Sequence, residues 1–282
     1  AEDGIRDFCL SRGLGDVYKR QQLYENMNRV VKLLNYSPVG RLGQSVPYKI
    51  SATNLLAESN YTIPRYSYVS TGGETYSINQ DITFTKFTSG DEVIENIANT
   101  YLAYQGIYQE YPIYNASGVE NEVIYLSLAD NVYVDHFNID VYVKYNETNS
   151  WVKWDRSSEL FLYKSNDKVF EARFNENKRY EIRFGDDING KKLNEGDQVL
   201  IYFLLVKDSG VGIGPGGLNN SIVVPFNSVN YTQVIKDTAT IYENFLNSDQ
   251  SKQIKLNNDY PSTLFSPEEN VDAIRKNAPK TF

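Results

Sequence analysis

The chain has 282 residues, of which 41% are hydrophobic and 23% are charged, as is typical of a soluble globular protein with one large or two modest domains. Its formal net charge of −8 disfavours direct binding to the phosphate backbone of nucleic acids. The sequence has no apolar run of the roughly 18 residues that a membrane-spanning helix needs, and without an uninterrupted apolar stretch residues 1–21 are not expected to be a signal peptide. Cys9 is the only cysteine, so no intrachain disulfide is expected, which favours assembly in a reducing cytoplasm.

Tyrosine is unusually frequent, with 23 tyrosines beside one methionine and one histidine. Aromatic rings fit the half-buried surface of a strand, and the hydroxyl group suits a hydrated rim. The composition therefore predicts sheets and extended contact surfaces.

The first 21 residues differ in composition from the rest and show neither helical nor strand periodicity. They are similar to the translation of sequencing-adapter read-through. We therefore expect residues 1–21 to be an artefact that contributes nothing to the fold.

The next segment, 22–36, places Leu23, Met27 and Val30 on one face and predicts an amphipathic helix that Pro38 ends. Alternating apolar residues then predict strands at 46–50, 61–68 and 75–87, with a turn at 71–74. Residues 91–104 fit either a helix or strands, and both interpretations stay open.

In the second half, short apolar runs predict further strands, and Trp151 and Trp154 are expected to flank a turn. Residues 179–206 are expected to form a hairpin whose returning strand, 199–206, is apolar on both faces and therefore central. The other expected strands lie at 123–126, 139–145, 160–163, 222–226 and 231–235.

The end of the chain predicts a second helix. Ser266 and Glu269 form a capping box with Pro267 at the first helical position. The helix is expected to continue through Ile274 and to end before Pro279.

Together these elements predict an α+β fold that is mainly β, with antiparallel sheets and an N-terminal and a C-terminal amphipathic helix. The pattern also allows a β domain inserted into a smaller β domain. The expected divisions are 1–21 as an artefact, 22–44 as helix and turn, 45–90 plus 218–260 as the smaller β domain, 91–217 as the inserted β-rich domain, and 261–282 as a truncated C-terminal helix.

Residues 212–217 match the glycine pattern of a dinucleotide-binding loop. Such a site needs a helix next, because the amides of its N-terminus hold the pyrophosphate. Residues 218–225 are strand-like instead, and Pro215 lacks an amide proton. We therefore interpret 212–217 as a connector and expect no cofactor.

Catalytic and metal sites are not expected either. Asp187 and Asn189 fit the start of a calcium loop, but Gly190 breaks the pattern, so turn chemistry explains these residues. His136 is the only histidine, which excludes His-based triads and multi-His metal sites; with Asp135 beside it, we expect a loop with a hydrogen-bonded imidazole. Paired carboxylates for glycoside hydrolysis remain open, but we predict that the chain is not an enzyme.

Three segments together resemble the baseplate wedge subunit of large contractile-tailed phages, within the baseplate J-like family. Residues 31–38 are similar to the family's helix ending in a Leu-(Gly/Asn)-Tyr-x-Pro turn. Residues 180–197 resemble its Arg-Phe-Gly-Asp-Gly…Gly-x-x-Leu…Gly-Asp signature, with Asp187 where glycine is usual. Residues 266–279 resemble its Glu-x-(Val/Ile)-x-x-Ile-Arg-x-x-Ala-Pro helix. The signature positions, all expected to be structural, are Tyr36, Pro38, Arg183, Phe184, Gly185, Asp186, Gly190, Leu193, Gly196, Asp197, Ile274, Arg275, Ala278 and Pro279.

The resemblance covers roughly residues 23–282 and implies a structural virion protein of the tail baseplate wedge, assembled in the bacterial host cytoplasm. It implies contacts with other wedge subunits and with a second copy of the chain, and neither a cofactor nor catalytic residues. An alternative interpretation is a tail-fibre or adhesin-like β module that binds glycans through exposed tyrosine and tryptophan.

Overall fold

The computed structural model describes residues 23–27, 30–31, 36–53, 59–86, 91–96, 100–129, 132–175, 177–207, 212–238 and 254–278. Strands predominate in these residues, and they pair mainly antiparallel. The expectation of a mainly β fold with antiparallel sheets is therefore confirmed. Within the described part of the chain, no helix combines the length and the apolar character that crossing a bilayer requires.

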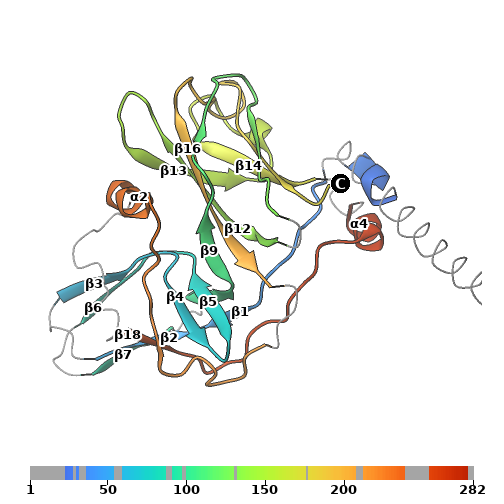
Figure 1. The fold of residues 1–282 in the computed structure, drawn as a ribbon. Coiled ribbons are helices and arrows are strands. Elements are labelled where there is room, and N and C mark those ends of the chain that lie inside the picture. Colours follow the sequence, from blue (N-terminus) through green and yellow to red (C-terminus); the bar gives the residue numbers. More distant parts are fainter. Residues whose placement is uncertain are drawn as a thin grey trace, which may run out of the picture.

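The larger sheet has eight strands and curls around its own hydrophobic core (Figure 1). Its strands are β9 (Ile107–Glu110), β10 (Tyr114–Asn115), β11 (Val123–Tyr125), β12 (Tyr133–Lys144), β13 (Trp151–Ser157), β14 (Val169–Phe174), β15 (Tyr180–Arg183) and β16 (Gln198–Val206). Their hydrogen-bonded order is β10-β16-β12-β13-β14-β15-β11, and β9 also pairs with β16. Only the pairing of β13 with β14 is parallel among these. Side chains such as Trp154, Phe170 and Phe184 fill the inside of the curl.

Three smaller sheets form the opposite end of the β region (Figure 1). Their strands are β1 (Ser45–Pro47), β2 (Lys49–Ala52), β3 (Ser59–Ile63), β4 (Tyr68–Thr71), β5 (Glu74–Ile78), β6 (Ile82–Lys86), β7 (Glu92–Ile94), β8 (Leu102–Gln105), β17 (Ser221–Ile222) and β18 (Ile254–Asn257). The orders are β1-β8-β5-β4, β17-β18-β2-β7 and β3-β6. One hydrophobic cluster, which includes Val46, Tyr76 and Leu256, lies among the three sheets.

A tyrosine-rich cluster joins the smaller sheets to the larger one. The ring of Tyr66 packs on Tyr108 and Tyr202, with centroids 4.3 and 5.0 Å apart. The Tyr66 hydroxyl donates to a carboxylate oxygen of Asp140 at 2.7 Å. Tyr231, at the start of α2 (Tyr231–Thr238), packs on the same cluster. Several of the tyrosines therefore hold the two β regions together rather than forming an outer surface.

Two local predictions are confirmed. Residues 71–74 form the turn between β4 and β5, where Gly72 and Gly73 have φ of 57° and 83°, the left-handed values that a tight hairpin requires. Strand β16 is central, because it pairs with β12 on one side and with β9 and β10 on the other. Its residues from Val199 to Leu204 are all buried.

Two predicted strands are wrong. Residues 231–235 begin helix α2, in which Tyr231, Val234 and Ile235 bury one face at helical spacing. Residues 160–163 form a short 3₁₀ helix, η1 (Leu160–Leu162), whose Phe161 and Leu162 are exposed. In α2 the packing of this buried face outweighs the strand preference of its β-branched residues, whereas in η1 the apolar side chains on which the prediction rested are not buried at all.

The predicted hairpin at 179–206 is also wrong. Strand β15 pairs with β14 and β11, whereas β16 pairs with β12. A central strand needs a hydrogen-bonded neighbour at each edge, and those of β16 are β12 at one edge and β9 and β10 at the other. Trp151 and Trp154 do not flank a turn but lie in β13, where both are buried.

Residues 91–104, for which the sequence allowed either a helix or strands, contain strands β7 and β8. β7 pairs with β2, and β8 pairs with β1 and β5, so both strands belong to the smaller sheets although they lie inside the range expected for the inserted domain. The chain passes to the larger sheet at Gly106, whose φ is +132°. A Cβ at this position would lie 2.1 Å from the carbonyl oxygen of Leu205, so only glycine fits. The division into domains itself stays a prediction.

The helices differ from their predicted limits. Residues 23–27 and 30–31 are helical, and the other positions of the predicted helix 22–36 lie outside the described residues or, at Tyr36, outside the helix. Helix α4 (Val271–Asn277) begins after Asn270, whose side chain accepts a hydrogen bond from Ala273 N at 2.9 Å. The predicted capping box is therefore wrong. Ser266 pairs with Leu42 instead, so its backbone cannot begin the helix.

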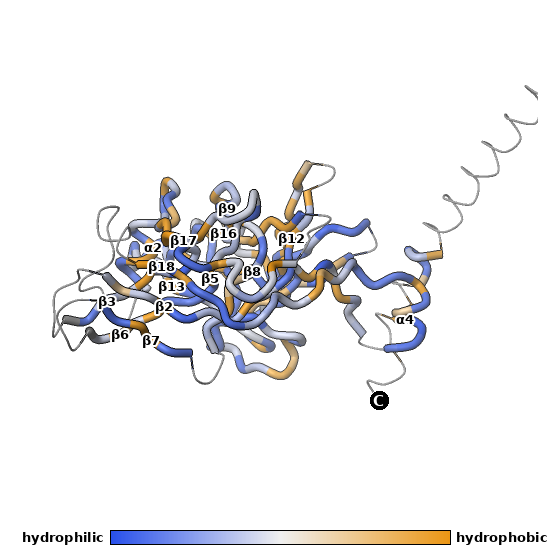
Figure 2. Tube along the Cα trace, turned by 90° about the horizontal axis from the view of Figure 1, so that it is seen from below, coloured by the Kyte–Doolittle hydropathy of each residue, from blue (hydrophilic) through white to orange (hydrophobic). Residues whose placement is uncertain are grey.

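Two connecting segments, residues 36–45 and 262–270, run side by side between the smaller sheets and α4 (Figure 1). Seen along a perpendicular direction, α4 again lies on the far side of the molecule from β3 and β6 (Figure 2). The connecting segments thus carry a helical end along the flank of the larger sheet.

Candidate assembly interface

The first and third signature segments contact each other through Glu269. The Tyr36 hydroxyl donates to the Glu269 carboxylate at 2.8 Å, and Val39 N donates to the same carboxylate at 3.0 Å. Asn277 Nδ2, from α4, donates to it at 2.7 Å. Burial and the adjacent Glu269 carboxylate raise the pKa of Tyr36 to about 12, so the phenol remains a donor.

The connecting segments are joined along their length. Leu42 N donates to Ser266 O at 2.9 Å and Ser266 N returns a bond to Leu42 O at 3.1 Å. Arg41 Nε lies 2.7 Å from Glu268 Oε2, and the Arg41 guanidinium also stacks on the ring of Tyr133, 3.3 Å from its centroid. Backbone and side-chain contacts together fix the register of the two segments.

The second signature segment reaches this pair through His136. Gly40 N donates to His136 Nδ1 at 3.1 Å, and Tyr180 Oη lies 3.2 Å from the same nitrogen. A Cβ at position 40 would lie 2.1 Å from Tyr180 Oη, so the backbone of the first connecting segment, two residues beyond the first signature segment, touches the side chain that begins the second signature segment. Lys178 adds an ion pair to Glu268 at 2.9 Å. All three signature segments therefore converge at one place, which we call the junction.

The junction keeps His136 uncharged. Burial, and then the positive charge of Arg156, lower the pKa of His136 to about 3. Arg156 also donates to the carbonyl oxygen of His136. The imidazole is satisfied, as expected, but it lies in strand β12 and not in a loop. A neutral acceptor without free access to solvent suits structural support of Gly40.

Asp135 holds the neighbouring turn of the first connecting segment. Its carboxylate accepts bonds from Gly43 N at 2.7 Å, from Phe137 N at 3.0 Å and from Asn138 Nδ2 at 2.8 Å. Burial raises its pKa despite these donors. The adjacent residues Asp135 and His136 thus bind Gly43 and Gly40, two glycines of one segment.

The carboxylates of the second signature segment hold turns. Asp186 accepts from Ile188 N and Asn189 N at 2.9 and 2.7 Å, and these bonds lower its pKa. Asp197 is buried, and its two oxygens accept from Asn146 N and Asn194 N, each at 3.0 Å. Because Asp186 Oδ1 and both oxygens of Asp197 accept from backbone amides, the arrangement supports the interpretation as turn chemistry.

The other signature positions divide between core, turn and surface. Phe184 and Leu193 are fully buried inside the curled sheet. Ile274 and Ala278 pack against Tyr24 and Val31 in a small helical core. Further signature positions are the buried Pro38, Arg183 in β15, Gly185 and Gly190 in the 185–190 turn, Gly196 with φ of +85°, and Arg275 on the exposed face of α4; Pro279 lies outside the described residues.

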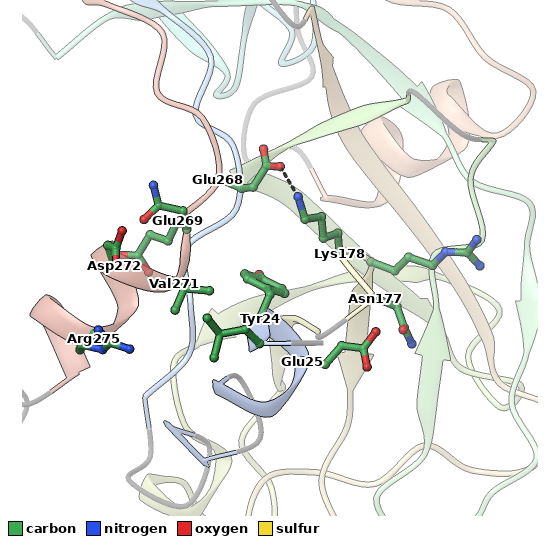
Figure 3. A pocket seen from close by; sticks show the side chains of 12 residues that line it. Tyr24, Glu25, Asn177, Lys178, Glu268, Glu269, Val271, Asp272 and Arg275 are labelled. Atoms are coloured by element: carbon green, nitrogen blue, oxygen red, sulfur yellow. Dashed lines mark hydrogen bonds and ion pairs between the residues drawn. The ribbon is translucent and has the colours of Figure 1, made fainter. Parts of the chain in front are cut away.

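A groove of about 1060 Å³ opens beside the junction (Figure 3). Its walls come from residues 23–25, from 177–179, and from 268–272 with Arg275 of the α4 region. Tyr24 and Val271 face each other across it, and Glu268 reaches Lys178. Charges of both signs surround its apolar centre: Glu25, Lys178, Arg179, Glu268, Glu269, Asp272 and Arg275. Such an arrangement suits a protein surface with a polar rim better than a catalytic pocket.

Sequence reasoning missed the residues that bind the signature segments together. Asp135, His136, Lys178 and Glu268 lie outside the signature positions, and their partners are distant in the chain. The single histidine was the one available signal, since it is unusual in this composition.

The structure gives no support to the other chemical motifs. Residues 215–220 form turns, and β17 follows them, so the glycine-rich segment lacks the helix of a dinucleotide site. Among the described residues, no group of three or more His, Cys, Asp or Glu side chains could hold a metal ion.

Comparisons with known proteins give little. No protein-family model matches the chain, and no curated protein matches it. Among solved structures, the six-fold symmetrised baseplate of the anti-feeding prophage aligns with 14% sequence identity and a TM-score of 0.24. The alignment covers 89% of this chain and 40% of that chain, so this chain spans less than half of the matched protein. At this score the superposition does not define a common fold.

Proposed function

We propose that the chain is a structural component of a contractile phage tail baseplate wedge and that it works by protein–protein contacts, not by catalysis. The observation that carries the proposal is the convergence of the three signature segments. Residues 31–38, 180–197 and 266–279 lie far apart in sequence, yet Tyr36, Tyr180 and Glu269 meet at the junction or directly beside it.

The chemistry of these segments fits a scaffold. Their carboxylates accept hydrogen bonds from backbone amides, and their apolar residues fill cores. A reactive site would instead leave a nucleophile or base facing a cavity. The pKa of His136 is lowered by burial, its Nδ1 accepts from Gly40 N and its carbonyl oxygen accepts from Arg156, so it supports the backbone and does not present a base.

The groove beside the junction is the proposed contact surface. Its mixed charges favour a partner of complementary pattern and make the association salt-dependent. We propose other wedge subunits and a second copy of the chain as partners, with assembly in the bacterial host cytoplasm and a final place in the virion. No role for nucleic acid is proposed, consistent with the net charge of −8.

The test is co-expression of the tagged chain with wedge subunits of a contractile-tailed phage and with a second, differently tagged copy. Arg275→Glu reverses an exposed charge that lines the groove, and it should weaken co-purification by at least about tenfold. Lys276→Glu is the matched control, because Lys276 is exposed on the same helical turn but does not line the groove.

Retention of a stoichiometric complex in the control and its loss in Arg275→Glu would support the proposal. A chain that purifies alone with every partner, and that binds a glycan saturably, would overturn it in favour of the adhesin-like alternative.

A further inference from the structure

The turn at residues 185–190 contains the Asn189–Gly190 dipeptide, which is the only Asn-Gly sequence in the chain. Asparagine is chemically labile when the next residue leaves its backbone nitrogen accessible, and glycine does so best because it has no Cβ. Asp187 and Ile188 are exposed and Asn189 is half-buried, so water reaches the Asn189 side of the turn, whereas Gly190 itself is buried.

The backbone amides around Gly190 all have acceptors. Ile188 N and Asn189 N donate to Asp186 Oδ1 at 2.9 and 2.7 Å. Asp187 N donates to Gly190 O at 3.1 Å, and Lys191 N donates to Asp167 O at 2.9 Å. Gly190 N is the exception: among the described residues it has no acceptor. The one amide that could attack the Asn189 side chain is therefore the one that the turn leaves unbonded.

From this geometry we propose that Asn189 is a site of spontaneous deamidation. Gly190 N bonds to Asn189 Cγ, the carboxamide C–N bond breaks, and ammonia leaves with the proton from Gly190 N. Water then adds to the resulting succinimide and opens one of its two C–N bonds. The product is aspartate or isoaspartate at position 189, with no oxidant or reductant involved.

The change would act on the second signature segment. Aspartate adds a negative charge next to Asp186, whose carboxylate already accepts the amide of residue 189. Isoaspartate lengthens the backbone by one carbon between residues 189 and 190, which displaces Gly190 O from Asp187 N. Both products loosen the turn that precedes β16.

Asn220–Ser221 is the internal control. Asn-Ser follows Asn-Gly in steric openness, but Ser221 N donates to Leu218 O at 2.9 Å and is therefore occupied. The two dipeptides thus compare an asparagine whose neighbouring amide is unbonded with one whose neighbouring amide is bonded.

The test is incubation of the whole folded chain in mildly alkaline buffer, followed by peptide mass spectrometry and isoaspartate detection. Conversion at Asn189 should be at least about tenfold faster than at Asn220, and within about tenfold of the rate in a free peptide of residues 183–196. Asn189→Gln should abolish the signal from this peptide.

A rate at Asn189 equal to that at Asn220 would overturn the proposal. So would a rate in the folded chain more than about tenfold below that of the peptide, because the turn would then hold the Asn189 side chain away from Gly190.

Discussion

Tyr36 and Glu269 are 233 positions apart, and the Tyr36 hydroxyl donates to the Glu269 carboxylate at 2.8 Å. This bond closes the helical end of the molecule, because Tyr36 follows the first helical segment and Glu269 precedes α4. The same carboxylate also accepts hydrogen bonds from Val39 N and Asn277 Nδ2. Glu269 thus organises a site that brings together both ends of the described chain.

Tyr36→Phe removes the hydroxyl but leaves the other donors to Glu269 in place. A hydrogen bond to a charged group contributes about 1.5–3 kcal/mol, and partial exposure places the expected loss of unfolding free energy near the lower limit. Urea denaturation measures the loss. Tyr260→Phe, at an exposed tyrosine, is the control and should change stability by less than about 0.5 kcal/mol. Equal effects of the two changes would show that the Tyr36–Glu269 bond contributes nothing.

Gly40→Ala should destabilise the junction by about 1–3 kcal/mol, because its Cβ would lie 2.1 Å from Tyr180 Oη. Gly214→Ala is the matched control, since nothing lies within 4 Å of a Cβ there. In a Tyr180→Phe background the cost of Gly40→Ala should be smaller, because the colliding oxygen is gone. An unchanged cost of Gly40→Ala in that background would contradict the close contact between Gly40 and Tyr180.

Phe203→Ala should cost about 3–5 kcal/mol, because the side chain is buried on the central strand β16 and its removal leaves a cavity. Lys192→Ala should be nearly silent, since no ion pair of its side chain is found among the described residues. Chemical denaturation of the two variants decides the point. Small, equal losses would mean that β16 does not carry the core.

The free energy of unfolding should depend on pH because His136 is buried in its neutral form. Its pKa falls from 6.5 to about 3 on folding, so between these values the unfolded state binds one more proton than the folded state. Stability due to this group is therefore complete above pH 6.5 and should fall by up to about 1.4 kcal/mol per pH unit below it.

Denaturation midpoints of the wild type and of His136→Gln between pH 6 and 5 isolate this effect. Burial alone would raise the pKa of Glu268, but the hydrogen bonds from Lys178 and Arg41 outweigh it, so the pKa is lowered in the folded chain. The stability that Glu268 contributes is therefore lost only below its usual pKa of 4.5, outside this pH range. In His136→Gln the loss of stability with falling pH that His136 causes should be absent. If stability falls equally steeply in the variant and in the wild type, His136 does not titrate on unfolding.

The sequence predicted local features that depend on period and turn chemistry. The 71–74 turn follows from two adjacent glycines, and the burial of β16 follows from its unbroken apolar run. Pairing could not be predicted, because β15 and β16 are neighbours in sequence but take their partners from β14 and β12. Helix α2 was missed since its Val and Ile favour strands in isolation, while its packing on Tyr66 rewards helical spacing.

The junction was predictable only in part. Tyr36, Tyr180 and Glu269 belong to the three segments that the sequence singled out, and their joint position is a property of the fold. His136 and Asp135 bind glycine amides of the first connecting segment across more than 90 positions, and no local pattern encodes such contacts.

The most direct test of the proposed function is hydrogen–deuterium exchange of the chain alone and in complex with wedge subunits. Assembly at the groove predicts slower exchange in peptides that cover residues 177–179 and 268–275, with unchanged exchange at residues 212–217. Unchanged exchange along both walls of the groove, in a sample where the subunits are present in excess, would contradict the account.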